Sequence, residues 1–308
     1  MRTIFFGTPA WAVPSLQAVL SSGLELTAAV TNPDRPAGRG LRARPSPVKA
    51  AAQVAGIKVL QPKSIKDPSF QGVMRALSPE ICIVVAYGKI LPKVLLEAPE
   101  LGFVNVHFSL LPAYRGAAPV QRALMDGATE TGVSIMSLTE GMDEGPVLAI
   151  RTVTVTQEDT AGALGDRLAA EGADLLVPTV LGYAAGSVVA QPQDDKRATY
   201  APKISDEETR IEWSKPHRVI QNLVRGLEPA PGAWTTFRGR RIKIRRVAVA
   251  ETSPGLAPGE LLAGNPLIVG TGSDPLEVLT AQSEGKRAMS GADLARGLRL
   301  EQSDAFDN

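Results

Sequence analysis

An amide and an imidazole lie two residues apart in the segment GFVNVHFSLLPAYRG, residues 102–116. Successive side chains of a β-strand point to opposite faces, so Asn105 and His107 share one face and the flanking valines take the other. Pro112 ends the strand, because proline has no N–H to donate to a ladder. Both polar groups are then in reach of one small group at a strand end. A core histidine with a satisfied hydrogen bond is the alternative.

A carboxylate that could act with this imidazole lies in the segment SIMSLTEGMDEGPVLAI, residues 134–150. A strand leads to a glycine-rich turn that carries Asp143 and Glu144, and a second strand follows. We expect the turn to bring Asp143 to the sheet edge of His107, where the pair could share a proton in acid–base chemistry. A plain hairpin, with Asp143 favouring the turn conformation, is the alternative.

The elements that would position these residues alternate between strand and helix. Apolar runs such as TIFFGT and ICIVVAY suit a parallel sheet covered on both faces, and the alternation predicts a doubly wound α/β domain. Ligands bind such sheets outside the carboxyl ends of the strands. GTPAW follows the first strand in place of the GxGxxG of dinucleotide-binding proteins. Two helical segments, 161–170 and 173–185, complete the domain.

Short strand-like pieces after residue 230 predict a small β-barrel or sandwich, with a final helix at 292–298. We place the first domain at 1–188, a polar linker at 189–206 and the second domain at 207–308. A total of 308 residues is consistent with two domains, each with its own core.

Cysteine and histidine are scarce, and no apolar run is long. One cysteine, Cys82, excludes an internal disulfide, and with two histidines it forms no metal-binding motif. No stretch reaches the roughly 18 apolar residues that a membrane span needs. We expect a cytoplasmic, monomeric protein that binds no metal and does not associate with a membrane.

Two basic segments stand out, because 33 Lys and Arg are balanced by 32 Asp and Glu in the whole chain. The segment 32–49 is a long loop, and 238–246 is strand-like with six cations. A mobile solvated loop and a charge-protected edge strand are the alternatives. Two basic segments on two domains favour a polyanion that contacts both. The candidate contacts are Arg35, Arg39, Arg42, Arg44, Arg241, Lys243 and Arg245.

Several motifs, in order, resemble the methionyl-tRNA formyltransferase family along nearly the whole chain. The signature N-x-H-x-S-L-L-P-x-x-R-G-x-A-P runs from Asn105 to Pro119, and GMDEGP contains Asp143. PDRPAGRG, PSPVK, VVAYGKILP, PAPGAW and GKRAMS also agree. The resemblance implies a Rossmann-like formyltransferase domain followed by an OB-like barrel that binds tRNA. It implies 10-formyltetrahydrofolate as formyl donor and initiator methionyl-tRNA as acceptor.

The same resemblance implies roles for particular residues. Asn105, His107 and Asp143 match the catalytic positions, and Arg39 matches a loop arginine at the tRNA acceptor arm. The asparagine and histidine would donate hydrogen bonds to the oxyanion of formyl transfer, and the aspartate would accept the amine's proton. The folate-contacting positions correspond to Ser109, Leu110, Leu111, Pro112, Lys89, Ile90 and Leu91.

Three rival functions remain at this point. Relatives use the same site on small amines, such as glycinamide ribonucleotide or an amino sugar nucleotide, and folate dehydrogenases share the two-domain arrangement. The glycinamide ribonucleotide enzymes are typically single domains, and the dehydrogenases carry large additional domains, so both fit this chain poorly. A non-catalytic RNA-binding protein on the same fold is the third.

Overall fold

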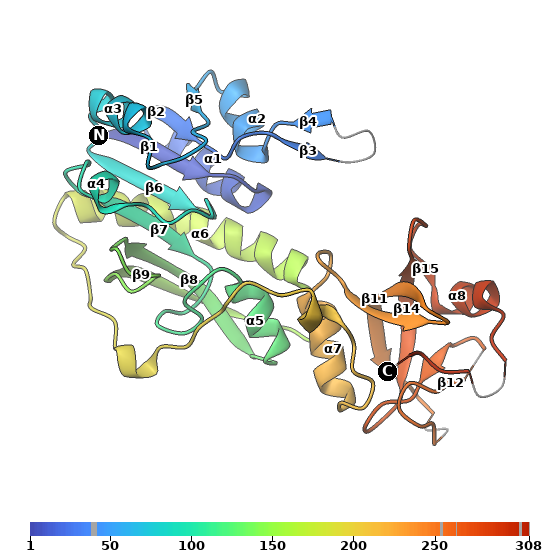
Figure 1. Ribbon diagram of the computed structural model, residues 1–308. Coiled ribbons are helices and arrows are strands. Elements are labelled where there is room, and N and C mark those ends of the chain that lie inside the picture. The colour runs from blue at the N-terminus through green and yellow to red at the C-terminus, as the bar shows by residue number, and fades with distance from the viewer. Residues whose placement is uncertain (38–41, 253–254, 263, 302–303, 308) are drawn as a thin grey trace. The chain divides into compact units, whose positions relative to one another are not determined.

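The computed structural model describes residues 1–37, 42–252, 255–262, 264–301 and 304–307 (Figure 1). The chain forms two compact units. Unit 1 comprises Met1–Pro119, Glu130–Thr154 and Gly165–Ala201, and unit 2 comprises Val120–Thr129, Val155–Leu164 and Pro202–Asn308.

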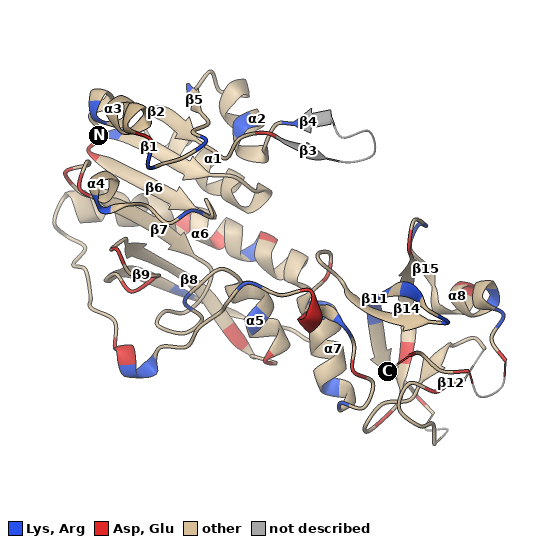
Figure 2. Cartoon of the chain, viewed as in Figure 1, with Lys and Arg blue, Asp and Glu red and all other residues tan. Residues whose placement is uncertain are grey.

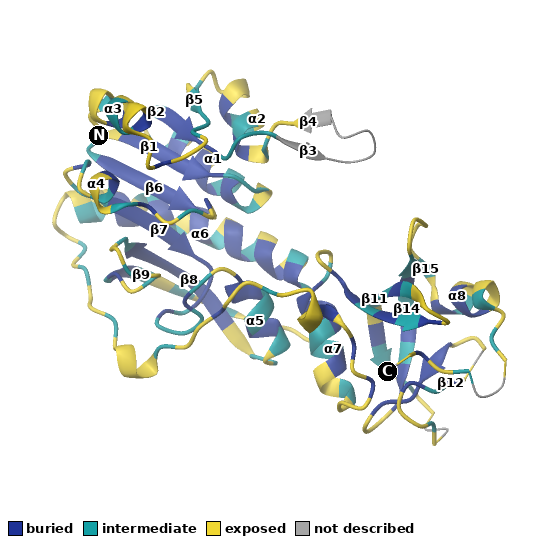
Figure 3. Ribbon diagram, viewed as in Figure 1, coloured by how far each residue is buried: buried dark blue, intermediate teal, exposed yellow. Residues whose placement is uncertain are grey.

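A seven-stranded sheet is the centre of unit 1, in the order β5-β2-β1-β6-β7-β8-β9. The first five strands in that order are parallel, as the apolar runs predict, and β8 and β9 are antiparallel additions at one side. The strands are β1 (Arg2–Gly7), β2 (Glu25–Val30), β5 (Val59–Leu60), β6 (Ile81–Val85), β7 (Phe103–His107), β8 (Glu130–Ser137) and β9 (Val147–Thr154). Every residue of β6 and β7 is buried (Figure 3).

Helices connect these strands. They are η1 (Ala10–Ala12), α1 (Val13–Ser21), α2 (Pro47–Val54), α3 (Pro68–Leu77), α4 (Lys93–Leu96), α5 (Pro119–Met125), α6 (Ala161–Ala184) and the short η2 (Asp195–Arg197). A separate two-stranded ribbon pairs β3 (Arg35–Ala37) with β4 (Arg42–Arg44). Ser46 caps the start of α2, because its hydroxyl accepts the backbone N–H of Lys49 at 3.1 Å.

The expectation of two helical segments between 161 and 185 was wrong, because α6 is one continuous helix. Gly172, where the sequence suggested a break, packs against β7. A Cβ there would lie 2.7 Å from Cγ1 of Val106. The missing side chain therefore lets the helix approach the sheet closely, and the backbone stays helical.

Unit 2 is built around an antiparallel sheet in the order β10-β11-β14-β13-β12, with β15 paired to β14. Its strands are β10 (Ala233–Phe237), β11 (Arg240–Val249), β12 (Leu261–Leu262), β13 (Ile268–Val269), β14 (Leu276–Ser283) and β15 (Met289–Ser290). It also holds η3 (Glu207–Thr209), α7 (His217–Gly226) and α8 (Gly291–Leu298). The expected β domain and its final helix are confirmed.

The segment 304–307 closes this sheet into a barrel. The carbonyl of Asp304 accepts from Leu261 N at 2.8 Å, and Phe306 N donates to Gly259 O at 2.9 Å. At the other edge, Asp307 N donates to Thr236 O in β10 at 2.8 Å. Both edges of the sheet are thus paired through one short segment, which removes open edge strands from this part of the barrel.

Phe306 anchors that closing segment in the core of unit 2. Its side chain is 2% exposed and stacks on Trp213 with ring centroids 5.3 Å apart. The ring of Phe237 packs edge-on from another side at 6.4 Å. Aromatic burial of this kind is a major source of core stability.

Phe306→Ala should therefore destabilise unit 2 by about 3–5 kcal/mol, the usual cost of truncating a buried phenylalanine. Denaturant unfolding followed by tryptophan fluorescence measures this loss, because Trp213 lies in direct contact. Phe306→Leu keeps an apolar side chain in the core and should cost clearly less. Wild-type unfolding midpoints for both variants would show that the segment is not part of the core.

Candidate active site

The site begins with two buried polar side chains at the end of β7. Asn105 is 9% exposed and His107 is 5% exposed, and strand alternation puts both on the sheet face of Phe103. Among the described residues, no group forms a hydrogen bond with the Asn105 side chain. The polar atoms of this amide are not among the buried unpartnered ones, so they reach solvent and are open to a ligand.

His107 is held through one ring nitrogen. Its Nε2 lies 2.9 Å from the carbonyl oxygen of Tyr114. A carbonyl can only accept, so Nε2 carries a proton. On the other side of the ring, Nδ1 lies 3.6 Å from Oδ2 of Asp143. That separation is longer than a hydrogen bond but within the range of an ion pair when the ring is doubly protonated.

Asp143 reaches His107 by a route that the sequence did not suggest. We expected the turn to bring Asp143 to the sheet edge of His107, and the two side chains do meet. The strand before the turn does not end there, because β8 runs antiparallel to β7 and ends with Ser137 opposite Val104, away from His107. Residues 138–146 must therefore return along the sheet before Asp143 meets the imidazole. Gly145 permits this close return, because a Cβ there would lie 1.8 Å from Ser137 O.

The backbone and side chain of Asp143 are both constrained. Its φ is 54°, in the left-handed region that aspartate tolerates better than most residues. Its Oδ2 accepts a hydrogen bond from Gly116 N at 2.8 Å. The amide of Gly116 belongs to the loop after His107, so the carboxylate links two separate motifs. The structure thus brings Asn105, His107 and Asp143 together.

The candidate folate residues of the segment 109–112 differ in exposure. Ser109 is fully buried, and its hydroxyl donates to Ala113 O at 2.6 Å. Ser134 in β8 secures the segment, because its hydroxyl donates to Ser109 O at 2.7 Å and accepts from Leu111 N at 3.1 Å. Leu110 and Pro112 are partly exposed, and Leu111 is buried. Ser109 therefore shapes the segment, while its neighbours offer surface.

The other candidate folate residues follow β6, whose carboxyl end lies beside that of β7. Leu91 is buried, Ile90 is 73% exposed, and Lys89 Nζ donates to Pro62 O at 3.2 Å. The ammonium also lies 5.8 Å from the ring centroid of Tyr87. Burial raises the pKa of Tyr87 to about 12, which makes its hydroxyl unsuited to proton transfer near neutrality.

The basic loop is described only in part. Arg39 lies outside the described residues. The backbones of Arg35 and Arg42 lie in the β3–β4 ribbon, where Arg35 pairs with Arg44, and the Arg44 side chain is exposed. At the base of the loop, Lys49 Nζ lies 2.5 Å from Asp34 Oδ2.

Lys and Arg residues colour much of β11 in Figure 2, and the three candidate cations of this strand have different surroundings. Arg241 lies over the ring of Trp234, with its Cζ 4.0 Å from the ring centroid. Lys243 Nζ donates to Pro231 O at 2.6 Å. Arg245 instead forms a two-pronged ion pair with Glu228, whose hydrogen bonds raise the pKa of that guanidinium. The charge of Arg245 is therefore compensated within the protein.

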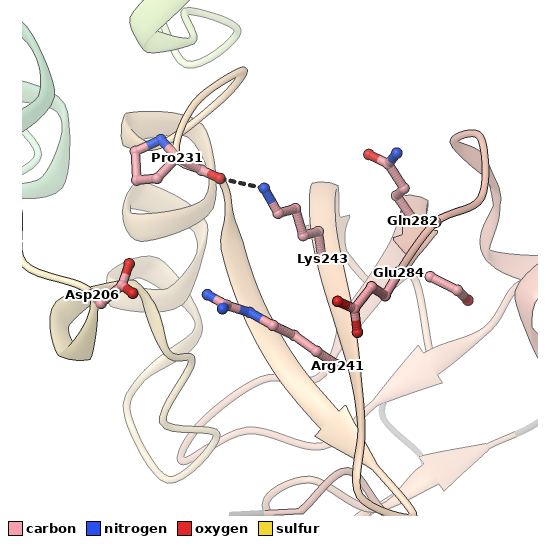
Figure 4. A pocket seen from close by; sticks show the side chains of 8 residues that line it. Asp206, Pro231, Arg241, Lys243, Gln282 and Glu284 are labelled. Atoms are coloured by element: carbon pink, nitrogen blue, oxygen red, sulfur yellow. Dashed lines mark hydrogen bonds between the residues drawn. The ribbon is translucent and has the colours of Figure 1, made fainter. Parts of the chain in front are cut away.

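An open pocket of about 340 Å³ lies beside Arg241 and Lys243 (Figure 4). Both side chains extend toward it from β11, and Asp206 and Glu284 also line it. The two carboxylates give the pocket a mixed charge. The carboxylates repel a polyanion, so the surface beside Arg241 and Lys243 is a more favourable place for one than the inside of the pocket.

Sequence reasoning missed Gln193, which contacts both motifs of the site. Its amide nitrogen donates to Asp143 O at 2.8 Å, and its amide oxygen accepts from Arg115 Nε at 3.1 Å. The residue lies in a polar stretch without periodicity, and nothing in that pattern indicates these long-range contacts.

Other kinds of site find no support within the described ranges. No group of three or more His, Cys, Asp or Glu side chains is arranged to hold a metal ion there. None of the described helices is long and apolar enough to cross a membrane.

Comparisons with known proteins identify the family of the chain. Residues 1–180 match the model of the formyl transferase family, and residues 203–299 match that of its C-terminal domain. A methionyl-tRNA formyltransferase from Streptomyces coelicolor is 49% identical over 306 residues, which cover 99% of both chains. Another from Solibacter usitatus is 43% identical, over 99% of this chain and 98% of that protein.

The chain belongs to the methionyl-tRNA formyltransferase family. Several solved structures share its fold. An N-formyltransferase from Helicobacter canadensis, in complex with folinic acid and dTDP-3-aminofucose, aligns with a TM-score of 0.68 at 16% identity, covering 92% of this chain and 98% of that one. HypX from Aquifex aeolicus, in complex with tetrahydrofolic acid, aligns with a TM-score of 0.66 at 16% identity. That alignment covers 100% of this chain and 51% of HypX, so the chain spans about half of HypX.

The contact with the Tyr114 carbonyl predicts the tautomer of His107. When the ring is neutral, its proton should lie on Nε2, because the Tyr114 carbonyl needs a donor there. Two-bond ¹H–¹⁵N correlation of the ring nitrogens measures this. The chain has two histidines, so His217→Gln assigns the signals. A neutral His107 ring protonated at Nδ1 would contradict the geometry.

Proposed function

We propose that the protein transfers the formyl group of 10-formyltetrahydrofolate to the α-amino group of methionyl initiator tRNA, for translation initiation. It is a one-carbon group transferase. One observation of the structure carries the proposal. An amide that has no partner among the described residues lies on the same strand face as an N–H-bearing imidazole, which is 3.6 Å from a carboxylate.

The three side chains divide the chemistry. The folate donor supplies the formyl carbon that the amine attacks. Asn105 donates its open N–H to the formyl oxygen as negative charge develops there, and one such donor in a water-poor site contributes about 3–4 kcal/mol. His107 adds a second donor when its Nε2–H leaves the Tyr114 carbonyl for that oxygen. Asp143 accepts the proton that the amine loses, directly or through water, and orients the imidazole.

The residues at the carboxyl ends of β6 and β7 suit a folate donor. The open amide of Asn105 is the observation that supports this fit, because it is a solvent-reaching donor that no described residue uses and that a ligand oxygen can accept from. We assign folate contacts to the segment 109–112 and to Lys89, Ile90 and Leu91. Ser109 acts through the backbone of its segment, since its hydroxyl is already donated to Ala113.

Unit 2 and the basic loop are assigned to tRNA. Arg241 and Lys243 contact phosphates, and Arg39 with its neighbours in the loop approaches the acceptor end. We propose residues 1–188 as the catalytic domain, 189–206 as the connection and 207–308 as the tRNA-binding domain. We further propose that the protein acts as a monomer in the cytoplasm.

A small-amine formyltransferase is the second candidate, because solved sugar N-formyltransferases share the fold. The relatives at 43–49% identity over nearly the whole chain favour methionyl-tRNA. The deciding experiment compares formyl transfer to charged initiator tRNA, glycinamide ribonucleotide and an amino sugar nucleotide. Transfer to a small amine alone would overturn the proposal, and no transfer to any acceptor would favour a non-catalytic RNA-binding protein.

Asn105→Ala and His107→Ala should each lower turnover by about two to three powers of ten while tRNA affinity stays nearly unchanged. Each removes a donor to the developing oxyanion without touching the basic surface. Asp143→Asn should be equally impaired, because an amide cannot accept the amine's proton. Single-turnover rates at saturating donor test this. Near-normal rates would refute the oxyanion and base assignments.

The β11 cations should differ in their salt dependence. Arg241→Ala and Lys243→Ala should each flatten the slope of log affinity against log salt by about one unit, because each lost phosphate contact releases fewer counterions. Arg245→Ala serves as the matched control and should leave the slope unchanged, since Glu228 already compensates its charge. Salt titrations of tRNA binding measure all three. Equal slopes for all variants would remove β11 from the tRNA surface.

A further inference from the structure

The side chain of Gln193 joins the two motifs of the candidate site. Its Oε1 accepts from Arg115 Nε at 3.1 Å and from an Arg115 terminal nitrogen at 2.9 Å. Its Nε2 donates to Asp143 O at 2.8 Å and to Gly145 O at 2.7 Å. All four hydrogen-bonding positions of the amide are used, and the partners fix which end is oxygen.

Arg115 is the rigid side of this junction. The side chain is 2% exposed, and the same terminal nitrogen also donates to Asp195 Oδ1 at 2.8 Å. Its backbone N–H donates to Thr199 O at 2.9 Å. A buried guanidinium needs such partners, because an unpaired buried charge is strongly unfavourable. Gln193 is thus held by a residue that cannot shift within the core without leaving its own charge unpaired.

Asp143 is the strained side of the junction. Its backbone has a φ of 54°, and the loop that carries it has doubled back from the far end of β7. Two carbonyls of this turn, those of Asp143 and Gly145, accept from one amide nitrogen. Without that nitrogen the turn can relax and carry the carboxylate away from His107.

The segment around Gln193 also supports the imidazole. Tyr114 N donates to Thr199 Oγ1 at 2.8 Å, and the Tyr114 carbonyl accepts from His107. Residues 193–199 therefore contact both the turn that carries Asp143 and the Tyr114 backbone that holds His107. This segment is not part of either sequence motif.

We propose that Gln193 is a positioning residue for Asp143, and that through it the Arg115 signature residue sets the separation of the carboxylate from His107. The proposal rests on the proposed function. The amide of Gln193 is already fully used by protein partners, so its role is to position Asp143 rather than to bind a substrate. Its effect is on the transition state, because misplacing a reacting group by about 1 Å can cost about 10²-fold in rate.

Gln193→Glu tests the two sets of contacts of Gln193 separately, because it keeps those with Arg115 and removes those with the turn. A carboxylate still accepts from Arg115, but it cannot donate to the carbonyls of Asp143 and Gly145. Gln191→Glu is the matched control, because it makes the same charge change two residues away on an exposed side chain. The measurements are kcat, KM for each substrate and the melting temperature, on the full chain.

We expect Gln193→Glu to lower kcat by about 10²-fold, with both KM values close to those of Gln191→Glu and a melting temperature only a few degrees lower, as the loss of two hydrogen bonds requires. In an Asp143→Asn background the same substitution should cause no further loss, because it acts through that carboxylate. A wild-type kcat, or an equal loss in the Asp143→Asn background, would overturn the proposal.

Hydrogen exchange keeps this test separate from the proposed function. The Gly116 amide, which donates to the Asp143 carboxylate, should exchange faster in Gln193→Glu, while the Ala118 amide, which donates to Ala201 O, should not. Unchanged protection of Gly116 overturns the positioning role whatever the acceptor is. Absence of formyl transfer by the wild-type chain would instead overturn the proposed function.

Discussion

The site depends on keeping the carboxylate of Asp143 beside the imidazole of His107. The strand before Asp143, β8, ends at the opposite end of β7 from His107. Asp143 lies at the far point of a loop that returns along the sheet in a left-handed conformation, which costs about 1–2 kcal/mol. A hydrogen bond contributes a net of about 0.5–1.5 kcal/mol. The bonds from Gly116 and Gln193 are together large enough to offset that cost.

Local patterns were enough to predict the part of the site that lies on one strand. Alternation placed Asn105 and His107 on one face, and apolar runs predicted the parallel sheet whose carboxyl ends lie together. Both inferences use neighbours in sequence or a regular period. They hold because a buried strand leaves its side chains few alternatives.

What the sequence could not show depends on contacts between distant residues. Gln193 meets Arg115 across 78 positions and Asp143 across 50, in a stretch without periodicity. Alternation also grouped Arg245 with Arg241 and Lys243, but only the structure reveals that Glu228 neutralises it. Likewise, residues 304–307 carry no motif, yet they pair with both edges of the antiparallel sheet of unit 2.

The division of the chain between the two units limits how natural or engineered chimeras can be made. Unit 2 includes Val120–Thr129 and Val155–Leu164 from the first half of the sequence. Those pieces are bonded to the rest of unit 2. Arg122 pairs with Glu208 at 2.5 Å, and Arg225 donates to Thr156 O at 2.9 Å. Recombination at a single point near residue 202 would therefore join the barrel of one protein to the segments 120–129 and 155–164 of another. Those segments would then face a barrel with which they did not evolve. Exchange of the whole unit requires three matched segments to be transferred together.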